Sequence, residues 1–353
     1  MGQPLSITVD SFGEIENKKV LLYHLSNDSI EVKLTNYGCS IVSVVTPDKT
    51  GHRENIVAGF DNFNQYKQGH PYFGCVIGRY ANRIAKGAFS IDGEHFQLDL
   101  NDGINHLHGG VHGFSRKIWE PIGMIQREDQ VGVVFAYTSA NGEEGYPGTL
   151  DVTVTYLLNT NNSLSIQYRA IADRSTIISL TNHSYFNLTG FRDDTIYEHY
   201  LQVNAESYTV KNENNTPSGV IASVIDTPLD FSEPQIIGKY IHEFKEDMGY
   251  DHNFVLRNNH TDINFAAHLF ELKTGRSLKI FTNQPGLQVY TANWWDGELT
   301  GEQHKKYRQH SAIALETQGF PDSPNHDHFP SAILRPSMVY EKETIFLFQT
   351  INL

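Results

Sequence analysis

The chain has 353 residues and carries 27 Lys and Arg against 41 Asp and Glu, a formal net charge of −14. This sign of charge opposes contact with phosphate backbones, so we do not expect a nucleic-acid partner. A composition of 39% hydrophobic and 19% charged residues is typical of a globular protein with a sizeable core, and it excludes a disordered chain.

The beginning of the chain lacks the basic start and apolar block of a secretory signal, and no segment approaches ~18 consecutive apolar residues. We therefore expect a cytoplasmic protein that is not bound to a membrane. The two cysteines, Cys39 and Cys75, indicate no disulfide framework and are expected to be buried, reduced thiols.

Strand-like segments occur from residue 20 to residue 351. The best alternation of apolar and polar residues lies in 150–157 and 163–170, and the turn-forming residues between them predict a hairpin with one buried face. In chain order, the other strand candidates are 20–25, 30–38, 41–46, 131–138, 277–283 and 345–351.

Helical periodicity is scarce, and the best short candidates are 234–244 and 298–307. No linker, charge run or internal repeat divides the chain. The sequence therefore predicts a mainly β protein, a large antiparallel two-sheet β-sandwich with a few short helices, in which residues 1–353 form a single domain.

Two histidines in the segment GINHLHGGVHGF have the spacing of metal ligands. His106 and His108 lie on the same side if the segment is extended, and His112 or His183 could supply a third nitrogen for a zinc ion. The alternative is that one imidazole faces a polar ligand and the other supports a turn. The HDH segment at 326–328 has the same spacing but lies in a proline-rich loop.

Two arginines four residues apart, Arg79 and Arg83, occur in the glycine-flanked segment GRYANRIAKG. The segment lacks the lysine and hydroxyl pair of a phosphate-binding P-loop. A guanidinium also donates paired hydrogen bonds to neighbouring hydroxyls, so a neutral polar ligand fits as well as an anion. The alternative is an arginine in a surface ion pair.

Three further polar residues stand next to strand-like or aromatic residues. Glu316 follows an apolar run, where a carboxylate at the end of a strand could act as a base, and Asp251 lies in GYDHNF among aromatic neighbours. His183 lies in TNHSYFNL, where hydrogen-bonding side chains alternate with aromatic ones. A solvated strand end, a turn-capping Asp and a structural histidine are the corresponding alternatives.

Taken together, these segments resemble the aldose 1-epimerase (galactose mutarotase) family over nearly the whole chain. The resemblance implies a large two-sheet β-sandwich and a reaction without a metal or cofactor. It rests on GRYANRIAKGAFSIDG (78–93), NHLHGGVHGFSRKIW (105–119), NGEEGYPG (141–148), LTNHSYFNLTG (180–190), MGYDHNF (248–254), TNQPGLQVYTAN (282–293) and LETQGFPDSPN (315–325).

Carried over residue by residue, the resemblance assigns His183 as the general acid and Glu316 as the general base. The implied substrate is a free aldohexose such as galactose or glucose, whose α and β anomers interconvert by ring opening, rotation and reclosure. This chemistry uses an imidazolium and a carboxylate, and we expect negative charge near His183 to favour the imidazolium. The residues implied to bind the sugar are Asn82, Arg83, His108, Ser184, Tyr185, Asp251 and Gln284.

Other functions are compatible with the same residues. A sandwich could bind carbohydrate without catalysis, a hexose-phosphate epimerase would need basic residues around the phosphate, and a glycosidase would pair Glu316 with a second carboxylate. His106 and the pair Trp294 and Trp295 depart from the family pattern, so the preferred sugar stays open. We expect a monomer or a homodimer.

Overall fold

The computed structural model describes residues 5–351, whose strands form three larger sheets and five two-stranded ones. All strand pairs within the three larger sheets are antiparallel. The prediction of a mainly β, antiparallel fold with a few short helices is therefore confirmed.

The largest sheet has nine strands and contains the hairpin that the sequence predicts. Its two strands pair in register from Leu150 with Ala172 to Leu158 with Leu164, and the alternating apolar residues of the first strand are buried. In sheet order the strands are β11 (Glu120–Gln126), β12 (Gln130–Ser139), β13 (Leu150–Asn159), β14 (Ser163–Ala172), β30 (Tyr340–Thr350), β24 (Arg276–Thr282), β23 (Asn264–Glu271), β18 (His199–Val203) and β21 (Gln235–Ile236).

Two smaller sheets have six and five strands. The six-stranded sheet has the order β17 (Tyr185–Phe186), β28 (Ile313–Gln318), β25 (Gly286–Tyr290), β22 (Asp251–Leu256), β19 (Ala205–Lys211) and β20 (Pro217–Ser223). The five-stranded sheet runs in chain order through β1 (Ser6–Ile15), β2 (Lys18–Ser26), β3 (Glu31–Thr35), β4 (Ser40–Pro47) and β5 (Arg53–Asn55).

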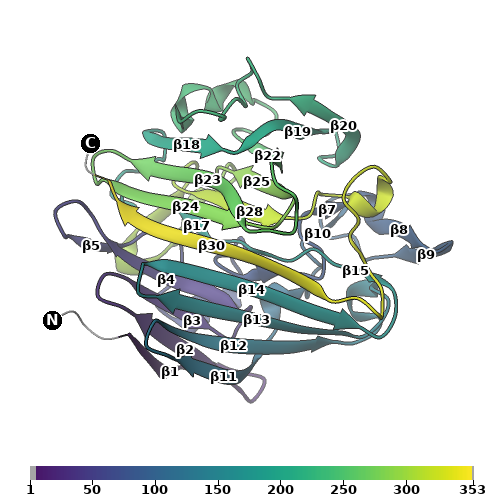
Figure 1. Cartoon of the computed structure of the whole chain (residues 1–353), viewed down its shortest axis with the longest axis horizontal. Helices are drawn as coiled ribbons and strands as arrows, with labels where there is room; N and C mark the ends of the chain where they lie inside the picture. The colour runs from purple at the N-terminus through teal and green to yellow at the C-terminus, as the bar shows by residue number, and fades with distance from the viewer. Residues whose placement is uncertain (1–4, 352–353) are drawn as a thin grey trace.

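These two smaller sheets pack against the nine-stranded sheet as the second layer of a sandwich (Figure 1). A bridge between Val57 and Phe186 joins them to each other. Aromatic pairs connect the layers: the Tyr23 and Phe135 rings lie 5.4 Å apart, as do those of Phe186 and Phe346. Because one apolar cluster draws on both halves of the chain, we propose that the described residues form one domain.

The helices differ from the sequence prediction. The one α-helix of the described residues, α1 (Phe63–Gln68), was not predicted because it has only six residues; Asn62 caps it by accepting the N–H of Gln65. The predicted helix 234–244 consists of β21 followed by two 3-10 turns, η4 (Ile237–Lys239) and η5 (Ile241–Glu243). None of the helices in residues 5–351 has the length and apolar character needed to cross a membrane.

The predicted helix at 298–307 is wrong. These residues form most of a hairpin of β26 (Asp296–Thr300) and β27 (Lys306–Arg308), with the 3-10 turn η6 (Glu302–His304) between the strands. Gly301 explains the difference, because a Cβ there would lie 1.9 Å from the Tyr307 hydroxyl oxygen. The glycine lets the hairpin close, whereas it would weaken a helix.

Short elements lie between the larger sheets. Two of them, β7 (Arg83–Ile84) and β10 (His106–Leu107), pair with each other and contribute Arg83 and Leu107 to the cavity described below. The remaining short elements are β6 (Val76–Ile77), η1 (Ala85–Gly87), β8 (Ala88–Ile91), β9 (Glu94–Gln97), η2 (Phe114–Arg116), η3 (Glu143–Gly145), β15 (Thr176–Ile177), β16 (Thr181–Asn182), η7 (Ser323–Asn325) and β29 (Ile333–Leu334).

Candidate active site

The segment around His183 crosses from one sheet to another. Residues 181–182 pair with β6, whereas residues 185–186 pair with β28, so His183 lies where the chain changes partners. Its imidazole is buried and lies beside the ring of Tyr185, with the ring centroids 4.7 Å apart. The polar residues of this segment thus serve a crossover between strands and not one continuous core strand.

Glu316 lies inside β28 and not at the strand end that the sequence suggests. It is opposite Gln288 in the antiparallel register, and Asp251 is opposite Tyr290 on the next pair of strands. Side chains two residues apart on a strand share a face, so the six-stranded sheet presents these four polar side chains together.

This face forms part of a cavity of about 420 Å³. The structure brings seven of the nine predicted site residues to its wall: Asn82, Arg83, His108, His183, Tyr185, Asp251 and Glu316. The wall also contains residues that the sequence analysis did not assign to the site: Pro71, Tyr72, Asp102, Leu107, Asn215, Gln288 and Tyr290, together with Trp294, whose role was left open.

Ser184 and Gln284 are the two predicted site residues that do not line the cavity. The Ser184 hydroxyl donates to the Asn182 side chain at 2.7 Å, and the Gln284 amide donates to the Leu180 carbonyl and the Tyr340 hydroxyl. Both side chains are about 1% exposed. Their direct contact with a sugar is therefore corrected to a supporting position inside the fold.

Gln288 occupies the wall in place of Gln284. Its amide donates to Asp251 at 2.5 Å, and it neighbours Glu316 on the adjacent strand. The alternation of β25 places Gln288 and Tyr290 on one face, but the sequence alone does not say which face meets the cavity. Knowledge of the strand register would have identified Gln288.

His183 and Glu316 form a buried pair at the cavity. Nε2 of His183 lies 3.4 Å from Oε1 of Glu316, and their side chains are 4% and 2% exposed. Burial lowers the pKa of the His183 imidazole to about 4, and it raises the pKa of the Glu316 carboxyl well above its usual value. These directions favour a neutral imidazole beside a protonated carboxyl.

The expected effect of nearby negative charge on His183 is present, but burial outweighs it. Asp251 does act to raise the pKa of His183, but loss of water around the buried ring is the larger effect. The neutral pair and the imidazolium–carboxylate pair contain the same number of protons and differ only in the position of one of them. Transfer of one proton between the two side chains, whose nearest N and O atoms lie 3.4 Å apart, interconverts the two forms.

Asp251 has a different environment from Glu316. Burial acts to raise its pKa, but Lys211 and Arg83 outweigh this effect and hold the pKa below its usual value. The Arg83 guanidinium also donates to Asp102 at 2.7 Å, and its Nη1 lies 3.9 Å from Asp251. The surroundings thus favour the ionised form of Asp251 and the protonated form of Glu316.

Ring nitrogens of His108 and His183 and a carboxylate oxygen of Glu316 lie within 4.8 Å of one another, close enough to hold a cation. The Asn82 backbone N–H, however, donates to Nδ1 of His108 at 3.1 Å. A neutral His108 therefore carries its proton on Nε2, which makes that nitrogen a donor into the cavity and not a metal ligand. The donor set favours recognition of an oxygen atom over a cation.

The sequence-based pairing of His106 with His108 is also wrong. His108 has a φ of 51°, which breaks the extended strand that would put both rings on one side. His106 is turned into the protein, with Nδ1 at 2.7 Å from the Asp99 carbonyl and Nε2 at 2.7 Å from the Tyr146 hydroxyl. Its role is structural, as the sequence alternative proposes.

Trp294 and Trp295 have opposite environments. Trp294 is 65% exposed at the wall of the cavity, whereas Trp295 is 8% exposed and packs against Phe73, Tyr185 and Tyr307. Only Trp294 is therefore placed to contact a bound molecule.

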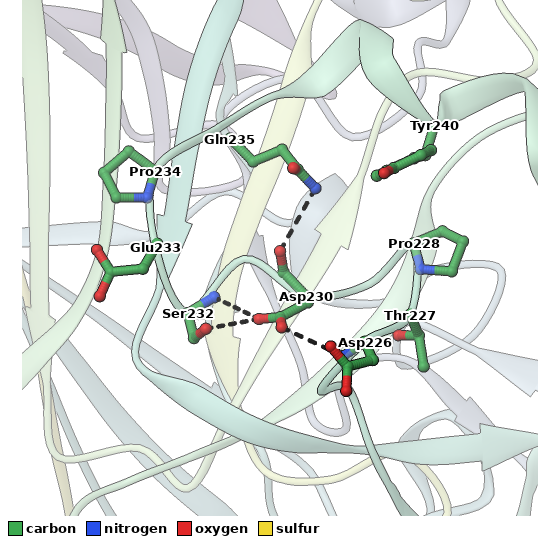
Figure 2. A pocket seen from close by; sticks show the side chains of 9 residues that line it. All are labelled: Asp226, Thr227, Pro228, Asp230, Ser232, Glu233, Pro234, Gln235 and Tyr240. Carbon is green, nitrogen blue, oxygen red and sulfur yellow. Dashed lines mark hydrogen bonds between the residues drawn. The ribbon is translucent and has the colours of Figure 1, made fainter.

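A second cavity, of about 500 Å³, is lined by residues of the segment 226–240 (Figure 2). Its Asp230 carboxylate accepts the N–H and hydroxyl of Ser232 and the N–H of Asp226, which lowers the pKa of Asp230. These bonds occupy the carboxylate in local turns. The cavity at His183, with a buried imidazole and carboxyl in contact, is the better candidate for acid–base catalysis.

Comparisons with known proteins agree with the fold and with this site. The family model described as aldose 1-epimerase matches residues 21–347. Galactose mutarotases from Sus scrofa and Homo sapiens are 40% and 41% identical to the chain, covering 98% and 97% of it and 99% and 98% of their own lengths. Aldose 1-epimerase from Escherichia coli strain K12 is 34% identical over 93% of the chain and 94% of its own length.

A solved structure gives the same result. Galactose 1-epimerase from Lactobacillus acidophilus NCFM superposes with a TM-score of 0.87 and 28% identity, covering 99% of this chain and 100% of that one. The chain belongs to the aldose 1-epimerase family, and the resemblance stated from its motifs is confirmed.

Proposed function

We propose that this protein is an isomerase, an aldose 1-epimerase that interconverts the α and β anomers of free aldohexoses such as galactose and glucose. The observation that carries the proposal is the contact of 3.4 Å between His183 and Glu316 at the cavity. In a cyclic aldose the ring oxygen and the anomeric hydroxyl are bonded to the same carbon. An acid and a base that act on both oxygens must therefore lie within a few ångströms of each other.

In the proposed reaction, Glu316 as a carboxylate takes the proton of the anomeric hydroxyl while His183 as an imidazolium donates a proton to the ring oxygen. The bond between the anomeric carbon and the ring oxygen breaks, which leaves an open-chain aldehyde. The aldehyde rotates about its bond to the adjacent carbon, and the hydroxyl then attacks its other face. Both protons return to their original holders, so the cycle needs no cofactor.

The two protonation forms of the His183–Glu316 pair fit this cycle, because they differ only in the position of one proton. Burial favours the neutral pair. In the proposed complex a hydrogen bond from a sugar hydroxyl to Glu316 stabilises the carboxylate. The proton then moves to His183, which becomes the acid. The enzyme takes up no proton from solvent during turnover.

Three other wall residues are proposed to hold the sugar. Nε2–H of His108 donates to a substrate oxygen, while Asp251 accepts from hydroxyls and Arg83 donates to them. Asn82 and Tyr185 complete the wall around the pair. Groups fixed in this way add orientation to the proton transfers.

The charges of the cavity support a free sugar over a hexose phosphate. Among the described residues of the wall, Arg83 is the one cation, and it already faces Asp102 and Asp251. Lys211, close to the wall, is likewise paired with Asp247 and Asp251. These cations are therefore already neutralised by carboxylates, which disfavours a phosphate dianion.

The cellular setting stays a proposal from the sequence. We propose a cytoplasmic monomer or homodimer whose partner is its small-molecule sugar. The net charge of −14 supports the absence of a nucleic-acid partner.

Polarimetry of freshly dissolved α-galactose and α-glucose tests the proposal. We expect the wild-type protein to speed the change in rotation and the variants His183→Asn and Glu316→Gln each to lose on the order of 10²- to 10⁴-fold in kcat. The unfolding curves of the variants show whether the fold is retained.

The same assay separates the alternatives. Sugar binding without faster mutarotation would identify a carbohydrate-binding protein, and acceleration confined to hexose phosphates would identify the phosphate-specific enzyme. Release of sugar from a glycoside would indicate hydrolysis. Full activity of both folded variants would refute the assigned pair.

A further inference from the structure

A buried arginine, Arg79, holds the loop 139–148 in place. Arg79 is 2% exposed, and its guanidinium makes five hydrogen bonds of 2.8 to 3.0 Å to the segment 139–148. The acceptors are the hydroxyl and carbonyl of Ser139 and the carbonyls of Ala140, Pro147 and Gly148. All five N–H groups of the side chain are therefore used to hold the two ends of this loop together.

The tip of this loop forms hydrogen bonds with the chain that follows His108. The two carboxylate oxygens of Glu144 accept the backbone N–H groups of Val111 and His112 at 2.9 and 3.1 Å. The hydroxyl oxygen of Tyr146, from the same loop, lies 2.7 Å from Nε2 of His106. The loop 139–148 thus contacts the chain on both sides of His108.

The chain after His108 is shaped for this contact. Gly109 and Gly110 have φ values of 82° and 102°, and a Cβ on Gly110 would lie 2.1 Å from Oε2 of Glu144. His108 itself has a φ of 51°, which a residue with a side chain adopts only when its surroundings hold it there. Glu144 supplies part of that support from outside the cavity.

We propose that Glu144 is a positioning residue for catalysis, which holds the loop 108–112 so that Nε2–H of His108 points at the substrate. This inference rests on the proposed function, because it assigns His108 to the bound sugar. Glu144 is not among the residues of the cavity wall, so it acts through His108 and not through the substrate.

The variant Glu144→Gln tests these two hydrogen bonds with little change in the size of the side chain. Its amide has one acceptor oxygen and one donor nitrogen, so one of the two backbone N–H groups loses its partner. Glu143→Gln is the matched control in the neighbouring position. Glu143 accepts from the hydroxyls of Tyr137 and Ser139, which can rotate and accept from an amide. Its Oε2 also lies 3.4 Å from Nζ of Lys117, a partly exposed ion pair whose loss should cost little.

A double-mutant cycle with His108→Asn distinguishes positioning from a general effect on structure. With α-galactose, we expect Glu144→Gln to lower kcat/KM about tenfold in the wild-type background, since small displacements of a positioning group are costly. In the His108→Asn background the same change should cost less than about twofold. Glu143→Gln should retain the wild-type kcat/KM.

Two results would overturn the inference: an equal loss in both backgrounds, or no loss in either. If Glu144→Gln does not fold, Glu144→Asp, which keeps both oxygens on a shorter side chain, replaces it in the same cycle. A wild-type protein without mutarotase activity would instead refute the proposed function. Thermal unfolding of every variant accompanies the kinetics.

Discussion

Arg79 and Arg83 lie four residues apart and are both largely buried, but they face opposite kinds of partner. Arg79 donates all of its hydrogen bonds to one hydroxyl and four backbone carbonyls. Arg83 faces carboxylates, with Asp102 at 2.7 Å and Asp251 at 3.9 Å, and lines the candidate active site.

The difference shows that the surroundings give two neighbouring arginines different roles, one in stabilising the fold and one in the candidate active site. Burial lowers the pKa of Arg79 to about 10, whereas nearby carboxylates outweigh burial and raise the pKa of Arg83. Arg79 has no donor left for a ligand, since its bonds close a loop. Arg83 is set among charges that a bound sugar can also contact.

Replacing Arg79 should give the largest effect in this comparison, and the effect should be on stability. Arg79→Met leaves buried carbonyls without donors, and we expect the free energy of unfolding to fall by about 4 kcal/mol. Urea unfolding followed by circular dichroism measures the change. A loss below about 1 kcal/mol would contradict the structural role of this arginine.

Replacing Arg83 should instead lower activity. In Arg83→Met, Asp251 loses one of the two cations that hold its pKa down, and Glu316 loses the cation that opposes the rise of its own pKa. We expect kcat/KM for α-galactose to fall about 10²-fold, with a smaller change in stability than for Arg79→Met.

Arg335→Met is the control for both arginines. Arg335 pairs with Asp92 at the surface, where such ion pairs contribute little. It should change neither unfolding nor mutarotation. If Arg83→Met behaves like this control, Arg83 has no part in the site.

Trp294→Ala should give the smallest effect. The ring is 65% exposed, so its contact with a sugar excludes little water. We expect KM to rise about threefold and kcat to be unchanged. Met124→Ala, exposed on β11, is the control, and an equal rise in KM there would remove Trp294 from the site.

The sequence predicts the parts of the fold that depend on local pattern. The hairpin of β13 and β14 follows from alternation, because each strand has one buried face and a short turn joins them. The helix predicted at 298–307 is wrong because Gly301 is needed for a close approach to Tyr307. This contact exists only in the folded hairpin. The six-residue helix α1 is too short to leave a periodic signal.

The candidate active site is also predicted only in part from the sequence. His183 and Glu316 are found from residue type and motif resemblance, but their contact depends on the pairing of β17 with β28. Gln288 lies in β25, and Gln284 lies just before this strand. Only the strand register shows that Gln288 is the one that meets the cavity. The side chain of His108 is oriented by the backbone of Asn82, which no pattern in the sequence reveals.

The pH dependence of kcat/KM for α-galactose tests most directly that His183 and Glu316 share one proton. Burial lowers the pKa of His183 from 6.5 to about 4, so a second proton binds the pair only as the pH falls toward about 4. Burial also raises the pKa of Glu316, so the shared proton is lost only well above 4.5. We therefore predict that kcat/KM is constant between these limits and falls on the acid side near pH 4. An acid limb with its midpoint at or above 6.5 would contradict the shared proton.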